Sequence, residues 1–277
     1  MVYGCGVTLH HQIAGEGSAV VLIHAGIADS RMWDAQWDAF TARHRTLRYD
    51  MHEFGRSPPP GGAFAHGRDL IELLERLEIG PAALVGVSLG GRVAAEVAVA
   101  RPDLVSALVL VGPGMPRAGW SDEVRRYGEE EERLLEAGDL DGAAEVTVRF
   151  WVDGEGRRPE DVDPAVRRAV HAMQLAAYGH MLAADEVEEL PTVEDLADRV
   201  AEIAAPTLLI LGEHDRADIA AAVEWLHQAI AGSRLERIPG AAHVPSMEQP
   251  ERFTELVLGF VAEAQATGRQ AGAPTTS

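Results

Sequence analysis

The stretch Gly86-Val87-Ser88-Leu89-Gly90 is the most informative in this 277-residue chain, because it joins an apolar run to a helical one. Residues 82–85 (AALV) before it have the composition of a buried strand, and residues 91–98 (GRVAAEVA) after it are typical of a helix. A serine at a sharp strand-to-helix turn exposes its hydroxyl beside the free N–H groups of the first helical turn. Glycines on either side leave room where strand and helix approach each other. The pattern predicts that Ser88 is a catalytic nucleophile.

On both sides of this turn, short apolar runs alternate with helical patterns. Residues 65–77, for example, place four leucines on one face of a helix. Several apolar runs are uninterrupted, as in strands that helices cover on both faces, so we expect an α/β fold with a doubly wound, mostly parallel sheet. The expected strands are residues 19–24, 45–49, 82–87, 107–111, 207–211 and 234–238, with residues 6–13 as an additional antiparallel strand.

The alternation of strands and helices stops after Val111. Residues 114–203 contain helical patterns and no convincing strand, and the strand pattern resumes at Thr207. We therefore expect residues 1–113 and 204–264 to form the core. The intervening block, 114–203, is expected to form a helical cap over the carboxyl edge of the sheet, where open α/β sheets bind ligands.

Two kinds of polar segment accompany this organisation. Runs of charge at residues 129–132, 155–160 and 186–189 lie within the helical block and are typical of solvated faces. Residues 265–277 are small and polar and contain Gly and Pro, so we expect a disordered tail there.

The composition excludes several chemistries. All 24 basic residues are arginine, and the chain contains neither lysine nor asparagine. These absences exclude a Schiff-base lysine, a phosphate-loop lysine, a Ser-Lys dyad and a Cys-His-Asn triad. The formal net charge of −20 argues against nucleic-acid partners and anionic membranes, because phosphate groups are contacted by clustered basic residues.

The single cysteine, Cys5, excludes an intrachain disulfide and any multi-cysteine metal site. No His/Asp/Glu group has metal-ligand spacing, so we expect neither a metal nor a cofactor. The chain begins without a signal-peptide pattern and has no apolar stretch of about 18 residues, so we expect a cytoplasmic protein without a membrane segment. The expected partner is a small-molecule substrate. The oligomeric state is left open, a homo-oligomer included.

Ser88 needs a base, and the base needs an orienting carboxylate, because a serine hydroxyl is a weak nucleophile at neutral pH. Asp215 follows the apolar run 207–211, and His243 lies in the loop after the last expected strand. Parallel strands bring such loops to one edge of the sheet, and the chain order Ser, Asp, His is typical of a triad built there. We therefore expect His243 as base and Asp215 as its partner. The rivals are His214 for the base, and Glu213 and Asp218 for the acid.

The developing oxyanion needs two backbone donors. The N–H of Leu89 directly follows the nucleophile, so it is one expected donor. The second is expected in the loop after residues 19–24, which reads His24-Ala25-Gly26-Ile27-Ala28-Asp29, and we assign it to the Gly26 N–H.

Taken with these motifs, the chain resembles the α/β-hydrolase family between residues 6 and 264. The resemblance implies the fold, the cap and the Ser-His-Asp roles given above. Two positions depart from the family pattern: Ala25 replaces a glycine, and Glu53 stands where the family has another glycine, so we expect that loop to be rearranged. The matching segments are His24-Ala25-Gly26 with Met32-Trp33, residues 50–57 (DMHEFGRS), and residues 243–253 (HVPSMEQPERF).

A weaker likeness, to 3-oxoadipate enol-lactonases, is carried by residues 31–36 (RMWDAQ) and 47–50 (LRYD). A carboxylate-bearing lactone would favour a cation in the pocket, and the nearest arginines in sequence are Arg31 and Arg92. Both are also typical of surface residues, so this substrate is not assigned.

The function expected from the sequence is that of a serine hydrolase, which cleaves an ester or lactone of a small, largely apolar substrate through an acyl-enzyme. The alternatives on the same fold are a C–C bond hydrolase, a lyase, a cofactor-free oxygenase or haloperoxidase, and a non-catalytic small-molecule receptor. The helical block offers apolar side chains to cover the site: Trp120, Phe150, Trp151, Met173, Tyr178 and Met181.

Overall fold

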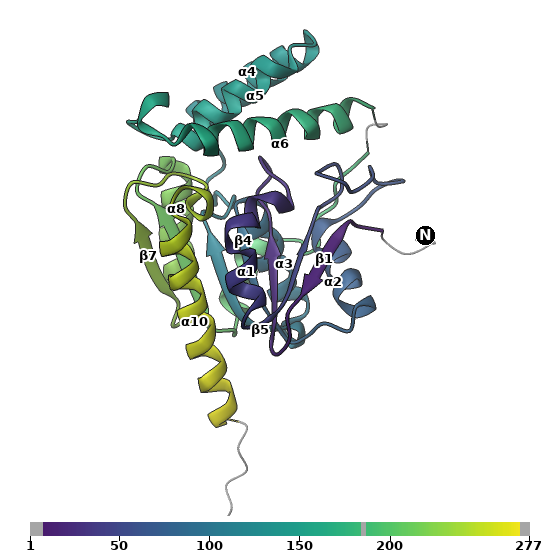
Figure 1. The fold of residues 1–277 in the computed structure, drawn as a ribbon, viewed down its shortest axis with the longest axis vertical. Helices are drawn as coiled ribbons and strands as arrows, with labels where there is room; N and C mark the ends of the chain where they lie inside the picture. Colours follow the sequence, from purple (N-terminus) through teal and green to yellow (C-terminus); the bar gives the residue numbers. More distant parts are fainter. Residues whose placement is uncertain (1–7, 184–186, 272–277) are drawn as a thin grey trace, which may run out of the picture.

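The apolar runs of the sequence form one seven-stranded sheet in the computed structural model, which describes residues 8–183 and 187–271 (Figure 1). The strand order is β1-β3-β2-β4-β5-β6-β7; β1 pairs antiparallel with β3, and the other pairs are parallel. The prediction of a mostly parallel α/β sheet is confirmed. The strands are β1 His11–Ala14, β2 Ala19–Ile23, β3 Arg45–Tyr49, β4 Ala82–Val87, β5 Val105–Val111, β6 Thr207–Gly212 and β7 Arg234–Ile238.

The burial of the strands follows their sequence. All six residues of β4 are buried, and so are all six of β6, as expected for strands that helices cover on both faces. The edge strand β7 instead carries exposed charged residues, which discourage pairing with another chain.

Helices cover both faces of the sheet (Figure 1). On one face α1 contacts α10, on the other α2 contacts α3, and the short helix η5 contacts both α3 and α8. The helices of the core are η1 Ser30–Trp33, α1 Asp34–Thr41, α2 His66–Arg76, α3 Leu89–Ala100, η2 Pro102–Leu104, α7 Leu196–Arg199, η5 Val200–Glu202, α8 Ala217–Ala229, α9 Pro245–Glu248 and α10 Pro250–Ala271.

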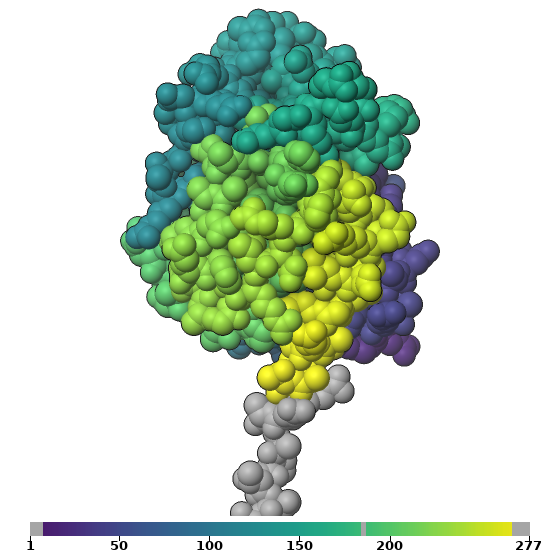
Figure 2. Space-filling view, turned by 90° about the vertical axis from the view of Figure 1, so that its left-hand side faces the viewer, coloured from purple at the N-terminus to yellow at the C-terminus, as the bar shows by residue number. Residues whose placement is uncertain are grey.

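The helices α4 Asp122–Glu136, α5 Leu140–Thr147 and α6 Pro164–Ala183 form a separate layer at one end of the sheet (Figure 1). Figure 2 shows this layer, in teal, resting on the C-terminal part of the core, in green and yellow. The α5 helix runs directly into a π-helical turn, η3 Val148–Asp153, and a short 3₁₀ turn, η4 Pro159–Asp161, follows. The turn η3 hydrogen-bonds to the loops after β6 and β7, so the layer covers the carboxyl end of the sheet.

The chain leaves this layer earlier than residue 203, the boundary expected from the sequence. Glu189 forms a bridge with Phe64 of the core, and α7 and η5 pack against α3. The helical pattern of residues 193–201 therefore belongs to a segment on the core surface.

Two local expectations were wrong. The helix α10 continues to Ala271, so residues 265–271 are helical rather than a disordered tail, because one glycine does not interrupt an otherwise helix-forming run. The loop at Glu53 keeps the left-handed backbone of the family's glycine, with φ 71°, instead of rearranging. A side chain there costs about 1–2 kcal/mol.

Within the described residues, no helix combines the length and apolarity needed to cross a membrane. Cys5, the first two residues of the expected strand 6–13, Glu186, and residues 272–277 of the expected tail lie outside the described residues.

Candidate active site

Ser88 lies at the turn between β4 and α3, in a strained backbone conformation. Its φ is 54° and its ψ −113°, which is unfavourable for any residue with a Cβ. The strand and helix hold it from both sides, since the Ser88 N–H donates to Val111 O at 2.8 Å and Ser88 O accepts from Arg92 N at 3.0 Å. Only glycine fits beside it: a Cβ on Gly86 would lie 2.1 Å from Gly90 O. The turn therefore has the geometry predicted for a serine nucleophile.

His243 and Asp215 form a buried pair. Nδ1 of His243 lies 3.0 Å from each carboxylate oxygen of Asp215, and the two residues are 1% and 6% exposed. The Arg216 N–H donates to Oδ1 of Asp215 at 2.8 Å and fixes that carboxylate. A carboxylate at Nδ1 holds the proton on that nitrogen and leaves Nε2 able to accept another.

The segment after β5 lies beside both Ser88 and the His243–Asp215 pair. A Cβ on Gly112 would be 2.9 Å from Oδ2 of Asp215 and 3.4 Å from Nδ1 of His243. Two residues on, a Cβ on Gly114 would be 3.8 Å from Oγ of Ser88, and the Gly114 N–H donates to Ser88 O at 3.2 Å. The three residues predicted for the triad thus gather around one short loop. In the described part of the chain, the Ser88 hydroxyl has no hydrogen-bond partner.

Gly26 and Leu89 are also neighbours. A Cβ on Gly26 would lie 3.4 Å from Cδ2 of Leu89. Neither backbone N–H donates to an acceptor among residues 8–183 and 187–271. Backbone N–H groups without an internal acceptor, on two neighbouring residues, are the kind of donor that an oxyanion hole requires.

His24 holds the loop that carries Gly26. It is fully buried, its Nδ1 bonds to Ala25 O at 2.8 Å, and its Nε2 accepts the Met51 N–H at 2.9 Å. Burial lowers the pKa of His24, so the ring is neutral and Nδ1 is the donor. Ala25 is buried and its φ is not positive, so an alanine is accommodated where the family has a glycine. From the sequence, His24 was recognised only as part of the segment His24-Ala25-Gly26, without a role of its own.

The rival residues have other contacts. The Glu213 carboxylate accepts from Gly240 N at 2.9 Å, and Nδ1 of His214 bonds to Glu155 O at 3.1 Å. Asp218 accepts the Ser121 N–H at 2.7 Å.

The two arginines considered as pocket cations are paired with carboxylates. Arg31 lies 2.6 Å from Asp29, and Arg92 lies 2.5 Å from Glu189 and 3.6 Å from Glu96. Their charges are already matched by neighbouring carboxylates.

The comparison with protein families agrees with this geometry: the model of the alpha/beta hydrolase family matches residues 20–256. The chain belongs to the alpha/beta hydrolase family. Both the recognition from motifs and the fold class are therefore confirmed.

This alpha/beta hydrolase is similar along nearly its whole length to proteins of differing activity. A Bacillus subtilis protein provisionally assigned as 2-succinyl-6-hydroxy-2,4-cyclohexadiene-1-carboxylate synthase is 29% identical, over 91% of this chain and 95% of the relative. A thermophilic esterase from Thermogutta terrifontis is 26% identical with a TM-score of 0.75, over 93% and 94% of the two chains. The enol-lactonase from Burkholderia xenovorans LB400 is 26% identical with a TM-score of 0.74, over 92% and 96%.

The apolar residues expected to cover the hydrolase site divide into three groups. Trp151 packs on the His243 ring, with 4.5 Å between centroids, and Met173 accepts the Asp29 N–H at its sulfur, at 3.5 Å. Trp120 and Phe150 pack around Trp151. The others lie away from these contacts: Tyr178 belongs to a small cluster inside the helical layer, and Met181 is 46% exposed.

Two residues in the predicted solvated runs make contacts inside the protein. The Arg157 side chain is 8% exposed and pairs with Glu248 at 2.7 Å. The Glu131 carboxylate accepts the hydroxyl of Tyr127 at 2.8 Å and also that of Tyr178. Glu248 lies 91 residues from Arg157 and Tyr178 lies 47 residues from Glu131, so no local signal marks these two contacts.

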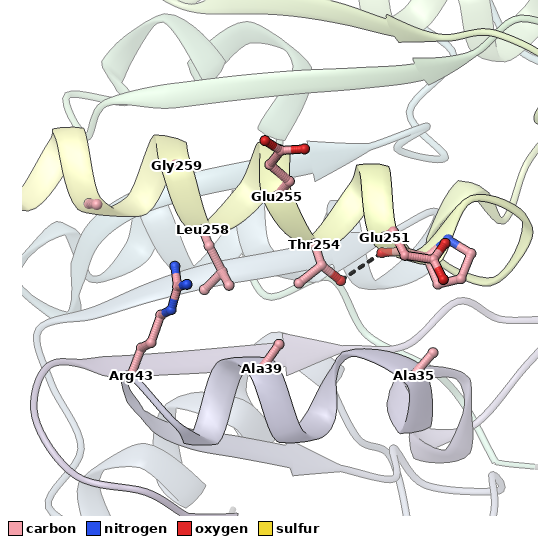
Figure 3. A pocket seen from close by; sticks show the side chains of 10 residues that line it. Ala35, Ala39, Arg43, Glu251, Thr254, Glu255, Leu258 and Gly259 are labelled. Carbon is pink, nitrogen blue, oxygen red and sulfur yellow. Dashed lines mark hydrogen bonds between the residues drawn. The ribbon is translucent and has the colours of Figure 1, made fainter.

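A groove elsewhere on the hydrolase lies between α1 and α10 (Figure 3). Small side chains such as Ala35 and Ala39 form one wall, and Leu258 and Thr254 lie on the other. None of the predicted catalytic residues lines it, so it is separate from the candidate active site.

Proposed function

We propose that the chain is a serine hydrolase that cleaves carboxylic esters or lactones of small, largely apolar substrates. The observation that carries the proposal is the convergence of the strained Ser88 turn and the buried His243–Asp215 pair on the loop Gly112–Gly114. Asp215 lies where an orienting carboxylate must lie on Nδ1 of His243, and Ser88 has the strained turn that exposes a nucleophile.

In the proposed reaction, Oγ of Ser88 attacks the carbonyl carbon and its proton passes to Nε2 of His243. Asp215 stabilises the imidazolium, and the N–H groups of Gly26 and Leu89 stabilise the oxyanion. The intermediate collapses to an acyl-enzyme as His243 returns the proton to the leaving alkoxide. A water, deprotonated by His243, then attacks the acyl-enzyme and releases the acid and free Ser88. No step needs a cofactor.

The substrate class has three kinds of support. An esterase and an enol-lactonase are among the similar structures, and both reactions break an acyl–oxygen bond. Arg31 and Arg92 are paired with carboxylates, which favours an uncharged substrate over a carboxylate-bearing one. The aromatic residues of the helical layer near His243, chiefly Trp151 and Phe150, favour an apolar acyl or alcohol group.

The proposal is tested with a panel of p-nitrophenyl esters and lactones of increasing chain length. We expect Ser88→Ala to abolish turnover and to prevent a mass increase after treatment with a fluorophosphonate. Ser233→Ala, which removes a hydroxyl bonded to His227 in the segment between α8 and β7, is the matched control and should behave as wild type. Turnover or labelling that persists in Ser88→Ala would refute the proposal.

A second candidate is elimination without an acyl-enzyme, with His243 acting as base on a carbon acid. The similarity to the B. subtilis protein, assigned as a synthase of a cyclohexadiene carboxylate, favours it. Two results with the wild-type protein would together support this candidate over hydrolysis. An activated ester would not acylate the protein, and the protein would release an unsaturated product from a suitable substrate.

A further inference from the structure

The π-helical turn η3 is the part of the helical layer that contacts the proposed base. The last four carbonyl groups of a helical segment have no partner within it, and here each is capped by the core or by the segment after the turn. Phe150 O accepts from Nη2 of Arg216 at 2.7 Å, and Trp151 O accepts from the His243 N–H at 3.4 Å. The carbonyls of the next two residues, Val152 and Asp153, accept from Arg157 at 2.6 and 2.8 Å.

Trp151 contacts His243 through its ring as well as its carbonyl. The indole and imidazole centroids are 4.5 Å apart, with 35° between the ring planes, and Trp151 is 8% exposed. His243 is therefore held at Nδ1 by Asp215 and on a ring face by Trp151. An aromatic face also attracts a cation, which the imidazole becomes when it accepts a proton.

The backbone that leads into His243 is held by a buried ion pair. Arg157 donates from Nη1 to Gly240 O and from Nη2 to Glu248, both at 2.7 Å. The second oxygen of Glu248 accepts the Ala242 N–H at 2.8 Å. The two side chains are 8% and 5% exposed, so water does not compete strongly for these bonds.

We propose that η3 positions the base: Trp151 fixes the plane of the His243 imidazole, while Arg157 and Glu248 fix the loop that carries it. The inference rests on the proposed function of His243. Because small displacements of a catalytic group reduce rates strongly, the expected effect is on chemistry rather than on substrate binding. Trp151 and Arg157 are positioning residues, since neither is required to touch the reacting atoms.

The test compares Trp151→Leu, Trp151→Phe and Trp37→Leu, with p-nitrophenyl acetate as a substrate that has a small acyl group. Trp37 lies on α1, where the Arg48 guanidinium is 4.5 Å from its ring, and is the matched control outside the aromatic group around Trp151. We expect kcat to fall about tenfold or more in Trp151→Leu, with KM changed less than about twofold. Trp151→Phe should restore most of kcat, because it keeps a ring against the imidazole, and Trp37→Leu should leave kcat nearly unchanged.

A second measurement is independent of turnover. The low-field proton resonance of the His243 Nδ1–H, identified by its loss in His243→Gln, should broaden or shift in Trp151→Leu and persist in Trp37→Leu. A wild type that neither hydrolyses esters nor reacts with fluorophosphonate would refute the proposed hydrolase, while the resonance would still test the positioning.

Three outcomes would overturn the positioning role. They are equal losses of kcat in Trp37→Leu and Trp151→Leu, a rise in KM alone in Trp151→Leu, and a resonance that Trp151→Leu leaves unchanged. If Trp151→Leu does not fold, as judged by circular dichroism, Trp151→Phe provides the comparison. A loss in Trp151→Phe as large as in His243→Gln would then refute the role of the ring.

Discussion

Nδ1 of His243 lies 3.0 Å from both carboxylate oxygens of Asp215. This arrangement presents an acceptor on either side of the Nδ1–H and leaves the imidazole one tautomer. Burial of both side chains, at 1% and 2% exposure, protects the contact from water. The pair is therefore prepared to take a proton at Nε2 without rearrangement.

Asp215→Asn should reduce kcat on the order of 10³-fold or more, because an amide does not replace the carboxylate in fixing the tautomer and stabilising the imidazolium. Glu213→Gln, at the neighbouring carboxylate that accepts from Gly240, should change kcat less than about twofold. Steady-state kinetics on a p-nitrophenyl ester provide the measurement. If the two variants exchanged these effects, Glu213 would be the orienting acid.

Arg157→Met should lower the free energy of unfolding by about 3–5 kcal/mol, because it leaves the Glu248 carboxylate buried without its cation. The adjacent Arg158 side chain is 70% exposed and pairs with Asp161, so Arg158→Met should change stability little. Urea unfolding followed by circular dichroism compares the two variants. Equal effects would show that the Arg157–Glu248 pair contributes no more than a surface pair.

Gly90→Ala and Gly26→Ala make the same change at two positions of the candidate site. A Cβ on Gly90 would lie 2.5 Å from the backbone oxygens of both Ile23 and His24, and the strain of roughly 1–3 kcal/mol exceeds the gain in helix propensity. On Gly26 it would make ordinary contact with Leu89 at 3.4 Å, at negative φ. Thermal unfolding should therefore show a destabilised Gly90→Ala and a nearly unchanged Gly26→Ala, which also keeps its N–H and its activity. The opposite order would contradict the tight approach of α3 to β2.

Asp69 makes stability depend on pH. Burial raises its pKa to about 6, and Oδ2 has no hydrogen-bond partner in the described part of the chain. Between about pH 4 and 6 the Asp69 carboxyl stays protonated in the folded state but is ionised in the unfolded state. The free energy of unfolding therefore falls as pH rises through this range. Asp69→Asn should therefore raise stability by about 1–3 kcal/mol at pH 7 and change it little at pH 4.

The measurement is urea unfolding at both pH values. Asp38→Asn, at an exposed carboxylate on α1, is the control and should be neutral at both. If Asp69→Asn were also neutral at pH 7, Asp69 would ionise normally in the folded protein.

Much of the core was predictable because its signals are local. An uninterrupted apolar run, a glycine-flanked serine and a small-residue helix place Ser88 at a strand-to-helix turn without knowledge of the rest of the chain. Parallel strands then bring the loops with Asp215 and His243 to the same edge. The disagreement at Glu53 arose because one substitution was taken to change the loop, and that in residues 265–271 because the composition of the whole tail was applied to residues that continue α10.

The helical layer was less predictable because its contacts join distant residues. No residue near Arg157 in sequence indicates its pairing with Glu248, so Arg157 was assigned to the solvated run 155–160. Likewise, an amphipathic pattern marks Trp151 as apolar but does not identify the ring it packs on.

The sequence by itself determined the order of the proposed catalytic residues along the chain: a serine, then an acid, then a histidine, each after a strand. It could do so because strands and turns are marked by local properties, the hydrophobic period and the turn residues. The tertiary structure decided which side chains hold those residues. Trp151 lies on His243, and Arg157 lies between η3 and the histidine loop, because buried polar and aromatic groups take their partners from packing between segments.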